Sequence, residues 1–444
     1  MKKFLAMLLC VVMVLSLCAC TATKEEAPAE KPAEAAPAET EAEAPAEAAP
    51  VEIALWTFPV GDWGDKATVD KLLEGFNAVH PEIKVTVEYL AYGGDGDAKI
   101  DAAIEGNQAP DIVFEGPERL VANWGAKGVM VDLADLWTDE VKADTYESVE
   151  AACHNAEGAY YEYPLCMTAH CMAINKNMFE AADALQYVDL DTHTWTTENF
   201  IKACEALTAS GQANIGDIFC NGSGGDQGTR ALINNLYGGT FTDEAHSKYT
   251  ADSEENIKAL EQLNSMDGFI FDSATNGGQE ADLFAQGTLA MAFCWNAATH
   301  AAREEVIGDA FEVIPMAFPS PNGTDTKLCG GIWGFGIFDN GDADRIEAAK
   351  TFVKYMADEN ITDAVAASGF WSTRKSAEDI YPGDEMKAVY GSFMPYMGDY
   401  YNVIPGWTEA RTAWSEMLQS IGTGTAPAEA AATFAEVANA AAAK

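Results

Sequence analysis

The chain has 444 residues, of which 48% are hydrophobic, and it carries 70 acidic against 26 basic residues for a formal net charge of −44. A surface this acidic repels nucleic acid and anionic lipid at long range, which argues against both as partners. The composition is otherwise ordinary for a folded protein, and the length beyond residue 50 exceeds one hydrophobic core, which predicts two domains.

The first twenty residues are typical of an export signal. Two lysines precede an apolar run over 4–17, and the run ends in Leu-Cys-Ala-Cys at 17–20. About 14 apolar residues are too few to span a bilayer stably, so the segment is expected to be cleaved. Cleavage before Cys20 would free its thiol and amine for acylation, for example by palmitate, and acyl chains anchor proteins in membranes. We therefore expect a lipoprotein on the outer side of the cell membrane, extracellular or periplasmic; ordinary signal cleavage near Ala22 is the alternative.

Residues 21–50 consist almost entirely of Ala, Glu and Pro and contain no aromatic side chain. Such a segment cannot bury a core, and like-charge repulsion together with proline stiffness keeps it extended. Its prolines recur too often for a long helix. The segment is therefore predicted to be a disordered linker that holds a folded body away from the lipid surface.

The body begins with a regular alternation of elements. The pattern predicts a strand, a helix, a strand, a helix and a strand at 51–56, 69–79, 83–89, 97–105 and 109–114. The first helix has apolar residues at spacings of three and four until His80-Pro81 stops it. The short strand, helix, strand unit favours a right-handed crossover between parallel strands.

Later segments continue the same alternation. Helices are predicted at 200–207, 346–356 and 410–421, and short strands at 287–295 and 331–338. Strands and helices that alternate over a chain of this length indicate two α/β lobes rather than a sandwich or a barrel.

Large aromatic and polar residues gather where the predicted strands end or where loops begin. They are Trp56, Phe58, Glu115, Trp295, Asn296, Trp333, Trp371 and Trp407. In open α/β sheets, ligands bind outside the carboxyl ends of strands, and a flat indole face lies well against the C–H face of a pyranose. These residues therefore indicate a sugar site; the alternative is that the aromatics fill space beneath the loops.

Cysteine and acidic clusters do not point to a metal. Seven cysteines remain once 10 and 18 leave with the signal and Cys20 is acylated, so at least one thiol stays free. Cys153, Cys166 and Cys171, with their neighbouring histidines, lack C-x2-C spacing and are interpreted as buried small side chains rather than zinc ligands. The aspartates at 339–344 lack an EF-hand pattern and are interpreted as a solvated turn. No metal and no cofactor are expected.

Motifs spread over about 390 residues carry a family resemblance. They include Gly75-Phe76-Asn77, His80 to Val85, Ala109 to Ile112, Tyr163-Pro164 with Ala173 to Phe179, Phe284 to Gly287, Gly330-Gly331, Ala348 to Tyr355, and Trp414 to Leu418. In their order and spacing they resemble the extracellular solute-binding proteins of ABC importers, family 1, whose relatives carry maltodextrins, other oligosaccharides and glycerol phosphates.

The resemblance implies a two-lobe periplasmic-binding-protein-like fold of type II. An N-terminal lobe would comprise 51–165 and 319–368, and a C-terminal lobe 166–318 and 369–444. The chain would cross a hinge three times, near 163–168, 314–319 and 366–373, and the lobes would close around ligand by a hinge motion. The membrane permease would then recognise the closed form.

The resemblance also supports a set of ligand-binding residues. Together with the aromatics at the strand ends, the expected set is Trp56, Phe58, Trp63, Glu115, His170, Trp295, Asn296, Gly331, Trp333, Trp371, Trp407 and Arg411. The run from Trp56 to Trp63 departs from the shorter polar turn of the maltodextrin binders, and its aromatics favour stacking on a sugar. A phosphate would want several donors, for which Arg374 and Arg411 are the only obvious candidates.

The sequence thus predicts a monomeric, non-catalytic receptor that delivers a neutral sugar or short oligosaccharide to the transmembrane subunits of an ABC permease. A receptor for glycerol-phosphate-type ligands is one alternative, and a surface adhesin or sensor is another. A glycosidase would need two carboxylates flanking the scissile bond, and no nucleophile motif is present. Release of reducing sugar would reveal the enzyme.

Overall fold

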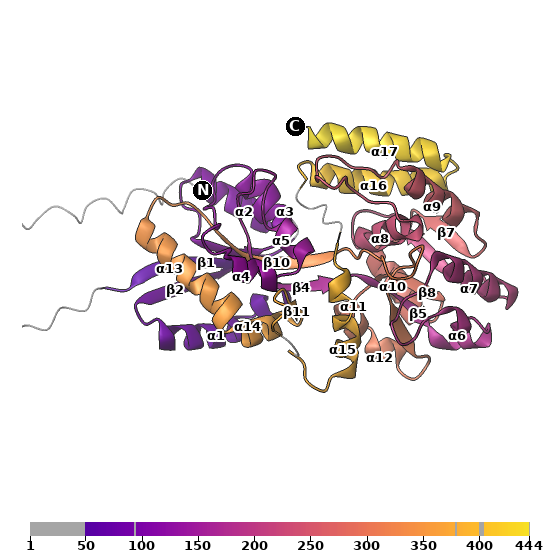
Figure 1. The fold of residues 1–444 in the computed structure, drawn as a ribbon, viewed down its shortest axis with the longest axis horizontal. Coiled ribbons are helices and arrows are strands. Elements are labelled where there is room, and N and C mark those ends of the chain that lie inside the picture. Colours follow the sequence, from indigo (N-terminus) through magenta and orange to yellow (C-terminus); the bar gives the residue numbers. More distant parts are fainter. Residues whose placement is uncertain (1–48, 93–94, 378–379, 399–403, 444) are drawn as a thin grey trace, which may run out of the picture. The chain divides into compact units, whose positions relative to one another are not determined.

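The computed structural model describes residues 49–92, 95–377, 380–398 and 404–443. Ala49–Lys444 forms one compact unit (Figure 1). The expected export signal at 1–20, the acylation site Cys20 and nearly all of the linker at 21–50 lie outside the described residues. Within the part of the chain that the structure describes, no helix has both the length and the apolar character that a membrane crossing requires.

Over the ranges just given, the structure forms three sheets, and the largest has six strands. They are β1 (Val51–Thr57), β2 (Ile83–Tyr89), β3 (Ile112–Glu115), β4 (Tyr163–Ala169), β10 (Gly330–Ile337) and β11 (Trp371–Ser372). Their order is β11-β4-β10-β3-β1-β2. β1 pairs in parallel with β2 and β3, while β10 runs antiparallel to β3 and β4. The carboxyl ends of β1, β2 and β3 therefore lie along one edge of the sheet, as the predicted crossovers require.

Helices accompany this sheet along the chain. They are η1 (Gly61–Gly64), α1 (Lys66–Val79), α2 (Asp95–Glu105), α3 (Pro117–Arg119), η2 (Leu120–Gly125), α4 (Asp139–Asp144), α5 (Glu147–Ala152), α13 (Ala343–Lys354), η4 (Tyr355–Glu359) and α14 (Ile361–Ser368). α1 begins where the Asp65 side chain accepts a hydrogen bond from the Thr68 amide, and it buries Phe76. α13 packs on β1 and α14 on β4, so both contribute to the core of this lobe.

Two smaller sheets organise the rest of the body. β5 (Cys171–Asn175), β8 (Met291–Trp295) and β9 (Val313–Met316) form a sheet in the order β8-β5-β9, and β6 (Gly216–Phe219) pairs in parallel with β7 (Phe269–Asp272). β5 and β8 are buried along their whole lengths. Such complete burial is typical of strands that are covered on both faces.

The helices around these sheets come from two stretches of the chain. They are α6 (Lys176–Ala181), η3 (Leu185–Tyr187), α7 (Thr197–Ala209), α8 (Asp226–Tyr237), α9 (Glu254–Ser265), α10 (Gly277–Ala285), α11 (Ala297–Ala301), α12 (Glu304–Ile307), α15 (Glu385–Gly391), η5 (Met394–Tyr396), α16 (Trp407–Gly422) and α17 (Pro427–Ala442). α8 and α10 pack on β8, and α16 pairs with α17, as the yellow helices of Figure 1 show.

The chain passes between the two sheet systems at short connections. β4 of the six-stranded sheet ends at Ala169, and β5 of the β8-β5-β9 sheet begins at Cys171. The connection between these two strands is therefore a single residue, His170. Ala169 pairs with Gly330, and Trp371 pairs with Met167. Because of this pairing, the larger sheet includes 166–169 and 371–372, which the sequence analysis assigned to the second lobe.

Several element bounds differ from the predicted ones because local capping and tight turns override the apolar pattern. The strand expected at 287–295 is only β8, since Gly287 adopts a φ of +72° just after α10. α7 and α13 start earlier than predicted because Thr196 and Asp342 cap them with their side chains. The helix predicted at 346–356 is α13, which continues as the π-helical η4.

Candidate functional site

The end of β3 places a buried carboxyl group beside an arginine. Glu115 is the last residue of β3 and is 1% exposed. Pro117 then starts α3 at the first helical position, where proline is favoured because it lacks an amide hydrogen. One oxygen of Glu115 accepts a 2.9 Å hydrogen bond from the Tyr92 hydroxyl, and the other accepts a 3.0 Å bond from Arg119 Nη1.

Arg119 is held on several sides. Its Nε and Nη2 donate to the two carboxylate oxygens of Asp97 at 2.5 and 3.0 Å. Its guanidinium carbon lies 5.3 Å from the centre of the Phe58 ring, and Phe58 stacks on Tyr92 with the ring centres 5.1 Å apart. Phe58, which the sequence analysis expected at the ligand, is fully buried beneath this arginine. The bidentate Asp97 pair fixes the plane of the guanidinium.

Carboxyl groups dominate the charge of this wall. Burial raises the pKa of Glu115 to about 8, the charge of Glu118 adds to the rise, and Arg119 opposes it. Glu162, just before β4, is fully buried, and neither of its carboxylate oxygens has a hydrogen-bond partner. Burial holds the pKa of Glu162 well above its usual range, and Glu118 and Glu115 add to that rise. Burial therefore disfavours the charged form of both carboxyl groups.

The opposite wall begins with Trp407, the first residue of α16. Gly406 precedes it with a φ of +75°, and a Cβ on Gly406 would meet the Ala441 carbonyl carbon at 2.6 Å, so a larger residue does not fit this turn. The guanidinium carbons of Arg230 and Arg411 lie 4.9 and 5.3 Å from the centre of the Trp407 ring. Two guanidinium cations thus lie close to the indole ring, and cation–π attraction favours this arrangement.

A buried aspartate organises both arginines. Asp226, the first residue of α8, is 2% exposed. It accepts hydrogen bonds from Arg411 Nε at 3.1 Å and Arg411 Nη2 at 2.7 Å, and it also accepts a hydrogen bond from Arg230 Nη1. Arg411 additionally donates to the Ser223 carbonyl. Arg411 therefore pairs with Asp226, rather than with Glu409 or Glu416.

These two walls line one cavity of about 370 Å³. The residues after β3 and from α2 supply one side, and the start of α16 supplies the other. The charged and aromatic side chains in the lining are Asp97, Glu118, Arg119, Trp407, Glu409 and Arg411. The cavity therefore combines an indole with hydrogen-bonding groups of both charges, which suits a hydroxyl-rich ligand better than an apolar one.

His170 lies at the connection between the sheets. Its amide donates to the Cys329 carbonyl at 2.8 Å, and its Nδ1 is buried without a hydrogen-bond partner. Burial lowers the pKa of His170 to about 4, while Asp226 opposes this and the two arginines reinforce it. His170 is therefore neutral near pH 7.

Three of the expected tryptophans pack in or against the hydrophobic core and do not line the cavity. Trp63 is fully buried and donates from Nε1 to the Ala364 carbonyl at 3.0 Å. Trp295 is fully buried as well, and its Nε1 donates to the Tyr390 hydroxyl at 2.8 Å. Trp333 is partly exposed and stacks on Phe370 with the ring centres 4.9 Å apart. None of these three lines the cavity of the two walls.

The remaining expected residues lie at separate places. The ring of Trp56 lies beneath the Lys99 ammonium at 5.1 Å, and Asn296 caps α11 by accepting from the Thr299 amide. A Cβ on Gly331 would collide with the Trp333 ring at 1.9 Å, so the glycine makes room for that indole. Trp371 lines a different pocket, at the edge strand β11. Only Trp407 and Arg411 of the expected set line the cavity, with Glu115 directly behind Arg119.

Sequence reasoning missed most of the charged residues at the cavity. Glu118 and Arg119 follow the third strand end within four residues of Glu115, and that position was the available signal. Asp97, Asp226 and Arg230 carried no comparable signal, because their approach depends on helix packing. Cys153, Cys166, Cys171, Cys204, Cys220 and Cys294 are buried free thiols, and Cys329 is buried as well. Over the ranges that the structure describes, no group of three or more His, Cys, Asp or Glu side chains is placed to hold a metal ion.

A two-lobe α/β fold with mixed sheets and a cavity lined from two separate stretches of chain is the architecture of a periplasmic-type binding protein. The chain belongs to the bacterial extracellular solute-binding proteins, because residues 61–360 match that family. This confirms the family and the fold class predicted from the sequence. No curated protein sequence matches the chain.

Solved structures share this fold. The GacH receptor of Streptomyces glaucescens, solved without ligand and with acarbose, has a TM-score of 0.63 at 20% identity over 87% of this chain and 97% of that one. A solute-binding protein of Agrobacterium radiobacter K84 in complex with ribitol has a TM-score of 0.63 at 22% sequence identity. The match covers 88% of this chain and 99% of that one. The maltose/maltodextrin-binding domain of Bdellovibrio bacteriovorus, bound to maltotriose, has a TM-score of 0.59 at 15% sequence identity. The match covers 88% of this chain and 99% of that one. At these identities the similarity shows the fold.

Proposed function

We propose that this protein is the substrate-binding component of an ABC importer, which captures a neutral sugar or short oligosaccharide and delivers it to the transmembrane subunits of a permease. The observation that carries the proposal is the cavity of about 370 Å³ with Trp407 on one wall and the Asp97–Arg119 pair on the other. An indole face supports a sugar ring, and flanking charged groups bind its hydroxyls.

The charges around the cavity favour a neutral ligand over a phosphate. Arg119 is held by Asp97 and Glu115, and Arg411 is held by Asp226. Arg374 lies outside the cavity lining, is 5% exposed and pairs with Asp358. A phosphate would therefore compete with existing carboxylate partners for both lining arginines, while facing Asp97, Glu118 and Glu409. A hydroxyl donates to a carboxylate and accepts from an arginine, so it fits without such competition.

The relatives support the same ligand class. Structures with this fold hold acarbose, ribitol and maltotriose, all of them rich in hydroxyl groups. The ligand of this chain is accordingly assigned by class, as a neutral polyhydroxyl compound.

Capture would use a hinge between the two lobes. We infer crossings at His170, between β9 and β10, and after β11. The lobes would then follow the expected division, 51–165 with 319–368 and 166–318 with 369–444, except that 166–169 and 371–372 pair within the larger sheet. Closure around the ligand would present one face to the permease. The receptor acts as a monomer without catalysis.

The protein would work at the outer side of the cell membrane. A signal at 1–20 with Leu-Cys-Ala-Cys at its end supports acylation of Cys20, and the Ala/Glu/Pro composition of 21–50 supports an extended tether. The family to which the chain belongs is extracellular. The anchor thus keeps the receptor close to its permease.

Calorimetric titration of the full chain with maltotriose, ribitol and glycerol 3-phosphate tests the ligand class. Binding of a neutral polyol or sugar supports the proposal, and Trp407→Ala should weaken it by roughly tenfold or more, because stacking on the indole is lost. Tyr187→Ala, an aromatic truncation in η3 outside the cavity lining, is the matched control. Binding of glycerol 3-phosphate alone, or release of reducing sugar from an oligosaccharide, would overturn the assignment.

A further inference from the structure

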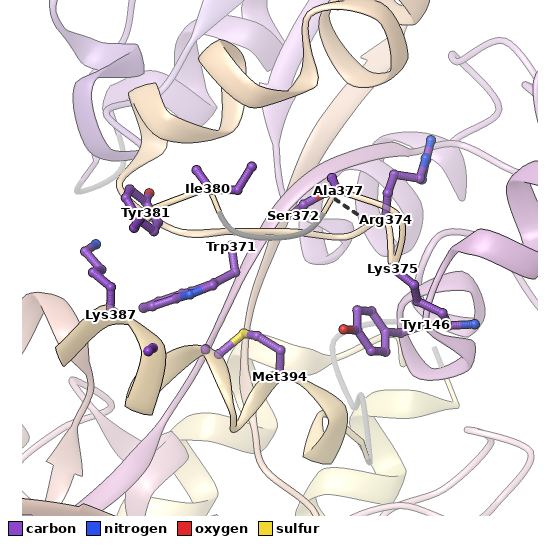
Figure 2. Close-up of a pocket in the computed structure, with 12 residues that line it drawn as sticks. Tyr146, Trp371, Ser372, Arg374, Lys375, Ala377, Ile380, Tyr381, Lys387 and Met394 are labelled. Carbon is purple, nitrogen blue, oxygen red and sulfur yellow. Dashed lines mark hydrogen bonds between the residues drawn. The ribbon is translucent and has the colours of Figure 1, made fainter. Parts of the chain in front are cut away.

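A groove lies between the last two helices of the chain, α16 and α17, which Figure 1 shows in yellow. It has a volume of about 380 Å³. It shares no lining residue with the cavity described above or with the pocket at β11 (Figure 2). Every lining residue lies between 413 and 437, inside the continuously described range 404–443. The groove is therefore a separate feature of the protein surface.

The two helices contribute matching stripes of residues to this groove. α16 supplies positions 413, 416, 417 and 420, and α17 supplies 430, 433, 434 and 437, so both stripes follow spacings of three and four. Glu429 adds one more position, and Thr425 comes from the connection between the helices. Seven residues of helix rise by about 10 Å, so each stripe is about two turns long. A groove between two such stripes can receive the ridge of a third helix.

Half of the lining is apolar. Its apolar residues are Ala413, Met417, Ala430, Phe434 and Val437. Val437 is 44% exposed, which is unusual for a large hydrophobic side chain in this protein. The hydroxyls of Ser420 and Thr433 donate to carbonyls of their own helices, so neither donor needs a partner from outside the chain. An apolar group placed in the groove would therefore leave water without stranding these polar groups.

Contacts beneath the groove fix the two helices in place. Trp414 of α16 and Phe434 of α17 pack edge to face with their ring centres 5.7 Å apart, and both contact Phe241. The Asn439 side chain of α17 accepts from the Tyr249 amide at 2.8 Å and donates to the Tyr249 carbonyl at 3.1 Å. The groove is thus formed before a partner arrives, which lowers the entropic cost of binding.

The charge along the groove is negative on both sides. Glu416 lines it from α16 and Glu429 from α17, and the lining contains no Lys, Arg or His. The glutamates of the range 404–443 are at 409, 416, 429 and 436, and its basic residue is Arg411, which pairs with Asp226. A partner with lysine or arginine on both sides of an apolar stripe would complement this pattern.

The same charge disfavours two other occupants. A second copy of the chain carries the same net charge of −44 and would bring its own glutamates against this face. The segment 21–50 of the chain itself has eight glutamates, at 25, 26, 30, 34, 39, 41, 43 and 47, against Lys24 and Lys31. A basic segment of a different protein is therefore the occupant that the charges favour.

We propose that the α16–α17 groove is a docking site for a basic amphipathic helix of a partner protein. The apolar stripe of that helix would lie on Val437 and the apolar lining, and its lysines or arginines would lie beside Glu416 and Glu429. Apolar burial supplies most of the affinity, while the charges select the partner and speed association. The site is independent of the sugar cavity, so it neither requires nor excludes the transport role.

The test uses the full chain and a fluorescein-labelled helical peptide of about 18 residues, with one stripe of leucines flanked by lysines. Fluorescence anisotropy measures the binding. We expect saturable binding to the wild-type chain. Val437→Lys should weaken it by about tenfold or more, because a charge then occupies the apolar lining. Glu429→Gln should weaken it by about threefold, as expected for an exposed ion pair.

Two matched controls lie outside the groove. Glu436→Gln removes the same charge from another exposed position of α17, and Val79→Lys places a lysine on another exposed valine, at the end of α1. Neither residue belongs to the groove lining, so both variants should bind the peptide as the wild type does.

Four results would overturn the proposal. The first is no saturable binding of the peptide to the wild-type chain. The second is equal binding of a peptide with the same composition in scrambled order, which would show attraction by charge alone. The third is an equal loss of binding in Glu429→Gln and Glu436→Gln, which would show a general charge effect. The fourth is dimerisation of the wild-type chain that Val437→Lys abolishes, which would assign the groove to a second copy. The first two comparisons use the wild-type chain, so they stand even if a variant does not fold.

Discussion

The guanidinium of Arg411 meets the carboxylate of Asp226 through two hydrogen bonds, with Nε–Oδ2 at 3.1 Å and Nη2–Oδ1 at 2.7 Å. Asp226 is almost fully buried, and it also accepts a hydrogen bond from Arg230, which has no exposed surface. One carboxylate thus contacts two cations and fixes Arg411 at the wall of the cavity. The orientation of a proposed ligand-binding side chain therefore depends on a residue 185 positions earlier in the chain.

Asp226→Asn should strongly destabilise the protein. The substitution removes the carboxylate charge that pairs with the buried Arg230, and breaking a buried ion pair in this way costs roughly 3–5 kcal/mol. Urea unfolding followed by circular dichroism would measure the loss. Asp70→Asn breaks the exposed Lys66–Asp70 pair in α1 and should leave the unfolding midpoint unchanged. Equal midpoints for Asp226→Asn and wild type would contradict the structure.

Tyr390→Phe should destabilise the lobe of the β8-β5-β9 sheet through one hydroxyl group. That hydroxyl accepts from Trp295 Nε1 and contacts His300 Nδ1 at 3.0 Å, and all three side chains are buried. Removing it leaves buried polar groups unpaired, which costs about 1–3 kcal/mol. Tyr237→Phe is the control, since its hydroxyl bonds to Gln262 at the partly exposed surface of α8 and α9. Thermal unfolding midpoints of the two variants should differ clearly.

Stability should fall as the pH rises towards neutrality. Asp217 in β6 is 1% exposed, and neither of its carboxylate oxygens has a hydrogen-bond partner. Burial raises the pKa of Asp217 to about 7, with a further contribution from Asp272. A carboxyl group with a raised pKa in the folded state stabilises fully below its unfolded pKa and loses that contribution as the pH passes its folded pKa. Glu280, whose pKa burial raises to about 8, acts in the same direction.

Asp217→Asn should therefore flatten the pH dependence. We expect its free energy of unfolding to decline less than that of the wild type between about pH 5 and about pH 8, because the amide does not ionise. Denaturant titrations across this range would measure both slopes. Identical slopes for the variant and the wild type would show that Asp217 ionises in the folded state as it does in the unfolded chain.

Gly228→Ala should reveal how closely α8 approaches β8. A Cβ at this position would lie 2.1 Å from the carbonyl oxygen of Phe293, so the helix or the strand must shift. Overpacking of this kind costs about 1–3 kcal/mol, which exceeds the gain of about 1 kcal/mol from better helix propensity. Gly224→Ala has no atom within 4 Å of the added Cβ and should be tolerated. Similar unfolding midpoints for both variants would refute the close approach.

Much of the fold could be predicted because its signals are local. The strand at Ile112 and the helix that ends at Val79 follow from apolar periodicity and from proline, which act within a few residues. The family motifs then supplied the two-lobe arrangement. The exact lengths of β8 and α13 were harder, because a positive φ at Gly287 and a cap at Asp342 decide them.

The site was less predictable because exposure depends on distant packing. Trp295 ends a strand, as a ligand-binding aromatic in this fold class should, yet α15 reaches across and buries it against Tyr390. Trp407 has a similar loop context and lines the cavity. The two indoles differ in which helix covers them, and this packing cannot be predicted from the neighbouring residues in the sequence.

The reactivity of the buried thiols can be used to follow the unfolding of this protein. Burial holds the pKa values of Cys153 and Cys204 well above the usual range and raises that of Cys166 to about 12, so the folded state contains almost no reactive thiolate at these positions. An alkylating reagent then modifies each cysteine only when its surroundings open. Cys153 and Cys166 belong to the lobe of the larger sheet and Cys204 to the other lobe, so the order in which they are labelled shows which lobe opens first.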